Sequence, residues 1–91
     1  MRESVSKPTE EIKTYRCPCC KFRTLHGRGG FEMCPVCWWE DDGQDEHNAE
    51  EVRGGPNGTL SLGQARINFE KYGASDEPFI GSVRKPLPDE I

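Results

Sequence analysis

The sequence has few large aliphatic side chains. Leu, Ile, Val and Phe together make up about 18% of its 91 residues, a share close to that of disordered proteins. A chain of this length suggests one small domain, and such a domain buries only about two-thirds of its unfolded surface. We therefore expect the fold to need a source of stability other than an ordinary hydrophobic core.

Long apolar runs are also missing. Residues 1–8 contain no apolar segment typical of a secretion signal, and no stretch reaches the roughly 18 apolar residues that span a bilayer. We therefore expect no membrane partner and a cytoplasmic location. In that reducing environment cysteines remain thiols, which can bind a metal.

Cations are fewer than anions. Twelve Lys and Arg stand against sixteen Asp and Glu, so the formal net charge is −4, and four zinc-bound thiolates would make it about −6. Non-specific nucleic-acid binding needs a basic surface, so we expect no nucleic-acid partner. The charge is also divided along the chain, because residues 13–30 contain no acid, whereas residues 40–51 contain seven.

What the sequence does contain is a pair of Cys-x-x-Cys motifs. Cys17 with Cys20 and Cys34 with Cys37 are separated by thirteen residues. Each motif places two thiolates on one tight turn, so two motifs supply the four corners of a tetrahedron. We predict one structural zinc ion with these four ligands, with iron or a disulfide pair as alternatives. The odd total of five cysteines argues against a framework of disulfides.

The fifth cysteine, Cys19, lies inside the first motif. We interpret it as a small, inert side chain beside the site, because free cysteine behaves as a small hydrophobe. Two alternatives stay open. Cys19 replaces Cys20 as a ligand, or it is a reactive thiol whose pKa is lowered by nearby cations such as Lys21, which would make the protein a redox sensor.

The pattern of elements predicts a small α+β fold: a zinc-ribbon-like β-hairpin, one main C-terminal helix and a short second helix. We expect residues 1–12 to be a flexible lead-in, 13–84 the zinc-binding domain and 85–91 an extended tail.

The hairpin is expected on either side of the glycine-rich segment 26–30. Residues 13–16 should enter the first cysteine turn as a strand, and residues 22–25 should leave it as a second strand. We predict that 22–25 pairs with 31–33, because this antiparallel pairing returns the second cysteine motif to the first.

The best helix is predicted between Ser61 and Gly73. Ser61 and Gln64 fit a capping box, and Gly73 can end the helix in the left-handed conformation. One apolar stripe contains Leu62, Ala65, Phe69 and Tyr72. A shorter helix should begin at 75–78 and bury Phe79, Ile80 and Val83 on one side.

Two tryptophans and an acidic segment follow the second motif. We expect Trp38 and Trp39 to pack beside the metal, with a partner-binding patch as the alternative. The acids at 40–51 are interpreted as a solvated loop, since the spacing after Asp41 does not fit a calcium-binding loop. The candidate interaction surface comprises Trp38, Trp39, Glu40, Asp41 and Asp42.

Several stretches together resemble the bacterial cysteine-rich CPCC family from about Tyr15 to Glu90. They are Tyr15-x-Cys17-Pro18-Cys19-Cys20, Cys34-Pro35-Val36-Cys37-Trp38-Trp39-Glu40-Asp41-Asp42-Gly43, Asn57-Gly58, Ser61-Leu62-x-x-Ala65-Arg66 and Arg84-Lys85-Pro86. The resemblance implies a small zinc-ribbon-like domain of uncharacterised activity, found around toxin and immunity loci, with Cys17, Cys20, Cys34 and Cys37 as ligands. Lys21 departs from the family, which usually has Gly there. Because this position of the turn prefers a positive φ, we expect either strain at Lys21 or a slightly different cysteine turn.

We therefore predict a zinc-stabilised interaction module that binds a protein and has no enzymatic activity. The oligomeric state and the partner are left open. The enzyme alternative is a small metal-dependent nuclease that uses the acidic loop with His47 and Asn48.

Overall fold

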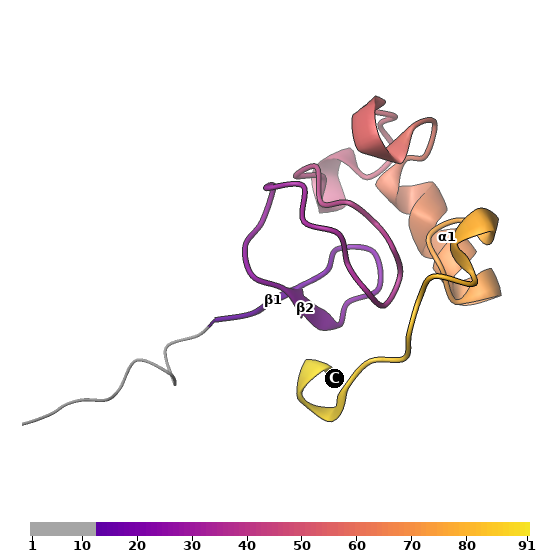
Figure 1. The fold of residues 1–91 in the computed structure, drawn as a ribbon. Coiled ribbons are helices and arrows are strands. Elements are labelled where there is room, and N and C mark those ends of the chain that lie inside the picture. Colours follow the sequence, from indigo (N-terminus) through magenta and orange to yellow (C-terminus); the bar gives the residue numbers. More distant parts are fainter. Residues whose placement is uncertain (1–12) are drawn as a thin grey trace, which may run out of the picture.

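The computed structural model describes residues 13–91, and the predicted lead-in at 1–12 lies outside this range. Two strands, β1 (Tyr15–Arg16) and β2 (Arg23–Leu25), form an antiparallel pair, and one α-helix, α1 (Leu62–Tyr72), lies beside the loops that follow them (Figure 1). Four single 3-10 turns complete the described elements: η3 (Glu46–Asn48), η4 (Gly55–Asn57), η5 (Glu77–Phe79) and η6 (Pro88–Glu90).

The strands pair differently from our prediction. β2 pairs with β1, with Tyr15 opposite Leu25, and not with residues 31–33. Those residues turn back on the chain that follows them, so that Met33 bridges Glu40. The expected 22–25 to 31–33 pairing is therefore wrong. The physical reason is local: each cysteine turn reverses the chain by itself, so the segments entering and leaving one turn become partners.

Helix α1 has the predicted start and end. The Ser61 hydroxyl accepts the Gln64 amide at 3.1 Å, and Gly73 ends the helix with a φ of 78°. The Gln64 side chain does not complete a capping box, because it donates to Asn68 Oδ1 at 2.9 Å instead. Leu62 and Ala65 at the start of the apolar stripe are fully buried, so the stripe faces the core.

The predicted second helix is the single 3-10 turn η5. Asp76 caps it by accepting the Glu77 amide at 2.9 Å, as expected for an acid at a helix start, but Ile80 is exposed and not buried. Residues 83–87 have no regular structure, and η6 then brings the end of the chain against β2. The tail is thus extended only as far as Leu87.

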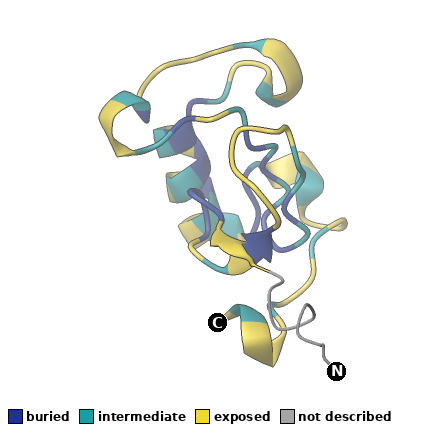
Figure 2. Ribbon diagram, turned by 90° about the vertical axis from the view of Figure 1, so that its left-hand side faces the viewer, coloured by how far each residue is buried: buried dark blue, intermediate teal, exposed yellow. Residues whose placement is uncertain are grey.

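The core is small and rich in sulfur. All five cysteines are buried, and the only buried hydrophobic side chains larger than theirs in residues 13–91 are Leu25, Val36, Trp39 and Leu62. Figure 2 shows this buried material where the loops meet the inner side of α1, with exposed residues around it. None of the described helices is long and apolar enough to cross a membrane.

Candidate metal centre

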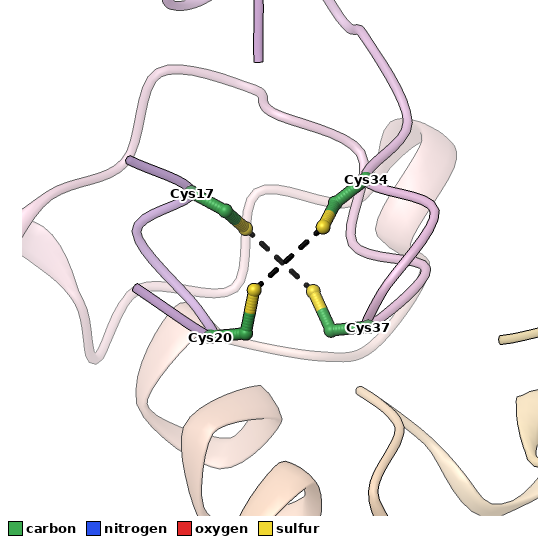
Figure 3. Close-up of side chains that lie close together, drawn as sticks. All are labelled: Cys17, Cys20, Cys34 and Cys37. Carbon is green, nitrogen blue, oxygen red and sulfur yellow. Dashed lines mark hydrogen bonds between the residues drawn. The ribbon is translucent and has the colours of Figure 1, made fainter. Parts of the chain in front are cut away.

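The four motif cysteines converge on one point. Their sulfur atoms all lie within 4.8 Å of one another, and all four side chains are buried. Figure 3 shows Cys17 and Cys20 facing Cys34 and Cys37, with every sulfur directed to the same centre. The structure thus brings together the whole predicted ligand set and leaves Cys19 outside it.

The spacing of the sulfurs fits a tetrahedral ion. Cys17 Sγ lies 3.6 Å from Cys37 Sγ, and Cys20 Sγ lies 3.7 Å from Cys34 Sγ. A metal–sulfur bond of about 2.3 Å gives a tetrahedron with edges of about 3.8 Å. Two of the six sulfur–sulfur distances therefore match this edge, and the four cysteines are placed so that they could hold one metal ion.

The two cysteine turns are near copies of one another. In the first, Lys21 N donates to Cys17 O at 2.8 Å and Cys17 N donates to Phe22 O at 2.8 Å. In the second, Trp38 N donates to Cys34 O at 2.7 Å and Cys34 N to Trp39 O at 2.9 Å. Cys-Pro-x-Cys is visible twice in the sequence, but we did not predict that an aromatic residue two places after each motif completes a structural repeat.

Both turns place a non-glycine residue at positive φ. The value is 72° for Lys21, which agrees with the first of our two expectations for this position, and 75° for the equivalent Trp38. Such residues are uncommon outside glycine and persist where the surroundings fix them. Here the amide of each donates to the carbonyl of the first cysteine in its turn, so the hydrogen bond that closes the turn fixes the conformation.

The repeat also explains Cys19, whose equivalent in the second turn is Val36. Both are buried, with exposed fractions of 4% and 2%. A small apolar side chain thus fills the same place in each turn, which favours the interpretation of Cys19 as packing rather than as a ligand.

Hydrogen bonds shift the pKa values of the cysteine thiols in opposite directions. Bonds from Cys17 and then Cys20 lower the pKa of Cys34, and the Thr24 hydroxyl, 3.0 Å from Cys34 Sγ, lowers it further. Bonds with Cys17 and then Cys19 raise the pKa of Cys37. Without a cation the four sulfurs cannot all ionise together, because like charges repel at this distance. A metal ion can replace the shared protons.

A second layer of contacts holds the turns against the rest of the chain. Arg66 on α1 donates from Nε to Pro18 O at 2.8 Å, and the amide of Arg84 donates to Pro35 O at 3.1 Å. The carbonyl after the first cysteine is thus anchored in both turns. Arg66 and then Lys21 also bind the exposed Glu46 and lower its pKa to about 2.

The predicted interaction surface is only partly exposed. Trp39 and Asp41 are completely buried, whereas Trp38, Glu40 and Asp42 are partly exposed. Trp39 and Asp41 are therefore not accessible to a partner, and the expectation of an entirely solvated acidic loop is wrong at Asp41. The packing of Trp39 beside the site agrees with our prediction for the tryptophans.

Asp41 is a structural residue of the loop. Its carboxylate accepts Arg28 Nε at 2.8 Å and Gly29 N at 2.7 Å through Oδ2, and Arg28 Nη2 at 3.3 Å and Gly43 N at 3.2 Å through Oδ1. Arg28 comes from the glycine-rich segment, so this pair ties the two loops together. The sequence alone does not indicate which acid pairs with Arg28, because residues 40–51 contain seven acids.

The remaining acids do not form a second metal site. Among residues 13–91, the four cysteines are the only group of His, Cys, Asp or Glu atoms gathered closely enough to hold an ion. His47 is exposed and pairs with Asp45 at 2.6 Å. The carboxylate of Asp41 is already occupied by Arg28.

These features define a class of protein: a small domain whose core is built around four buried cysteines positioned to bind a metal ion. A family model described as cysteine-rich CPCC matches residues 15–90. The chain belongs to this family, as the resemblance of its motifs indicated. No curated protein and no solved structure matches the chain.

Proposed function

We propose that the bound ion is zinc and that it is structural. The observation that supports this is the closed site: four buried sulfurs fill the tetrahedron and leave no open position for water or substrate. Elemental analysis of the purified protein should find one zinc per chain. Iron in a sulfur tetrahedron would colour the protein, so a visible absorption band would contradict the assignment.

We propose further that the zinc-stabilised domain is a cytoplasmic interaction module that binds another protein. A closed metal site supports binding rather than catalysis, because catalytic zinc keeps one ligand position for the substrate or water. The surface of residues 13–91 offers exposed apolar side chains, among them Phe31, Val52 and Ile67, with exposed fractions of 57%, 59% and 60%. Apolar and aromatic contacts supply much of the energy of protein interfaces.

The test is reconstitution with purified components. Proteins captured from an extract of the source organism by the zinc-loaded chain would be purified and titrated against it by calorimetry. We expect a saturable complex of fixed stoichiometry, whereas failure of every captured protein to bind would contradict the module. The implied tie to toxin and immunity loci is a separate prediction, which the neighbouring genes would test.

The two alternatives have less support. A nuclease would need a second, carboxylate-bound ion, and Asp41 is bound to Arg28. A redox sensor would need an accessible Cys19 thiol, and that side chain is 4% exposed. Magnesium-dependent cleavage of DNA, or rapid modification of Cys19 in the zinc-loaded protein, would restore the corresponding alternative.

A further inference from the structure

An open groove of about 420 Å³ lies between the cysteine turns, the end of α1 and the C-terminal segment. Among the residues that line it are Phe22, Val36, Phe69, Tyr72, Val83 and Lys85. Phe22 belongs to the first cysteine turn and Val36 to the second, so the groove is built directly on the metal centre. In Figure 1 the C-terminal segment leaves the region of α1 and runs toward the strands.

The groove is apolar and partly pre-formed. Phe22 and Phe69 contact each other edge to face, with ring centroids 6.5 Å apart and planes at 71°. Both rings are only partly buried and thus keep surface for another apolar group. The volume is in the range of pockets that hold a ligand or a large side chain.

The charge of the groove is opposite to that of the protein. No acid lines it, and two cations, Arg84 and Lys85, do, although the net charge of the chain is −4. Glu90 holds the Arg84 guanidinium through two bonds of 2.9 Å. Lys85 is exposed and forms no ion pair with another of the described residues, so its ammonium group is available at the rim.

We propose that this groove docks an acidic segment of a partner protein, with one large apolar side chain between the phenylalanine and tyrosine rings and a carboxylate on Lys85. The inference rests on the proposed binding function and assigns it a surface and a partner chemistry. An apolar anchor supplies affinity, and the charge at the rim selects acidic over basic sequences. The acidic loop at 40–51 is then not the docking surface.

The test uses the zinc-loaded full chain and three synthetic twelve-residue peptides. The first carries one Trp among Asp and Glu; the second replaces the acids by Lys; the third replaces the Trp by Ala. Amide chemical shifts of the ¹⁵N-labelled protein report where each peptide binds. We expect only the first to move the amides of Phe22, Val36, Phe69 and Val83, with saturation as it is added.

Two variants of the protein sharpen the test. Lys85→Glu should weaken binding of the acidic peptide about tenfold, since a favourable charge contact becomes a repulsive one. Arg53→Glu makes the same charge change in a separate cavity beside Phe31 and should leave binding unchanged. The spectrum of each variant also shows whether it has folded.

The outcomes separate this inference from the proposed function. Equal binding of the acidic and basic peptides, or no binding of any peptide, overturns the groove proposal. Shifts at Trp38 to Asp42 also overturn it but retain the interaction module. Groove shifts that appear on concentrating the protein alone identify a second copy as the occupant and overturn the acidic partner.

Discussion

At the scale of single residues, Thr24 is the clearest influence on the metal centre from outside the ligand set. Its buried hydroxyl lies 3.0 Å from Cys34 Sγ and favours the thiolate. Thr24→Val removes this bond with little change in volume, so protons should compete better with the metal, and the affinity for zinc should fall about tenfold. Competition with a chromophoric chelator measures the change.

The controls for Thr24 distinguish hydrogen bonding from packing. Thr24→Ser retains a hydroxyl and should keep most of the affinity, while Thr59→Val alters an exposed threonine and should change nothing. If Thr24→Val binds zinc as tightly as the natural protein, the hydroxyl has no role in tuning the sulfur.

Cys19 provides a test of the ligand set. Because it occupies the place of Val36 in the repeated turn, Cys19→Ala should retain one zinc per chain and lose about 1 kcal/mol of unfolding free energy, as for a small core truncation. Cys20→Ala should lose the ion. Zinc content and thiol titration check both variants, and loss of zinc from Cys19→Ala alone would make Cys19 the ligand.

Substitution of Asp41 should lower the free energy of unfolding, because this residue holds two loops together. In Asp41→Asn, one carboxylate oxygen that accepts N–H groups is replaced by an NH₂ group, which cannot accept them. The substitution also removes the negative charge that compensates Arg28. We expect a loss of about 3 kcal/mol, the low end for a broken buried pair, because the Arg28 side chain is 35% exposed and can regain water. Urea unfolding at fixed free zinc measures it, with the exposed Asp89→Asn as the matched control.

At the scale of elements, Arg66 connects α1 to the first cysteine turn. Its bond to Pro18 O is charge-assisted and partly buried, whereas its partner Glu46 has a side chain 73% exposed. Arg66→Gln should therefore cost about 1.5–3 kcal/mol of unfolding free energy. Glu46→Gln should cost less and should lose its effect in about 1 M salt, which screens exposed pairs. Equal losses in the two variants would contradict the primary role of the Pro18 contact.

The pH dependence follows from the same pair. The pKa of Glu46 is lowered to about 2 from an ordinary value of 4.5. A lowered carboxyl pKa contributes stability above pH 4.5 that is lost as the pH falls toward 2. The difference between Glu46→Gln and the natural protein should accordingly stay constant at neutral pH.

The elements also show why sequence reasoning succeeded in one place and failed in another. Helix α1 is encoded locally, by a cap at Ser61 and a left-handed stop at Gly73, and both were predicted. The strand partners depend on how tightly a cysteine turn reverses the chain. Spacing suggests that the motifs meet, but it does not say that each turn closes its own short ladder.

At the scale of the whole molecule, some features of the site are likewise encoded by local sequence, and others depend on contacts between distant segments. The four ligand candidates follow from two spacings in the sequence, because each spacing sets one turn. Burial of Asp41 and the groove on the metal centre depend on segments far apart in the chain, such as Arg28 with the acidic loop and Val36 with the C-terminal segment. No local pattern of residues predicts such pairings.

Removal of the metal tests the account of the fold as a whole. Five cysteines, three alanines and only four larger hydrophobic side chains form the buried apolar core of residues 13–91. The apparent binding energy of a structural zinc is about 10–16 kcal/mol. Complete chelation should therefore collapse the dispersed amide spectrum, and one equivalent of zinc should restore it. Chelator already saturated with zinc is the control. A metal-free chain that keeps its dispersed spectrum would show that Leu25, Val36, Trp39 and Leu62 hold the fold without an ion.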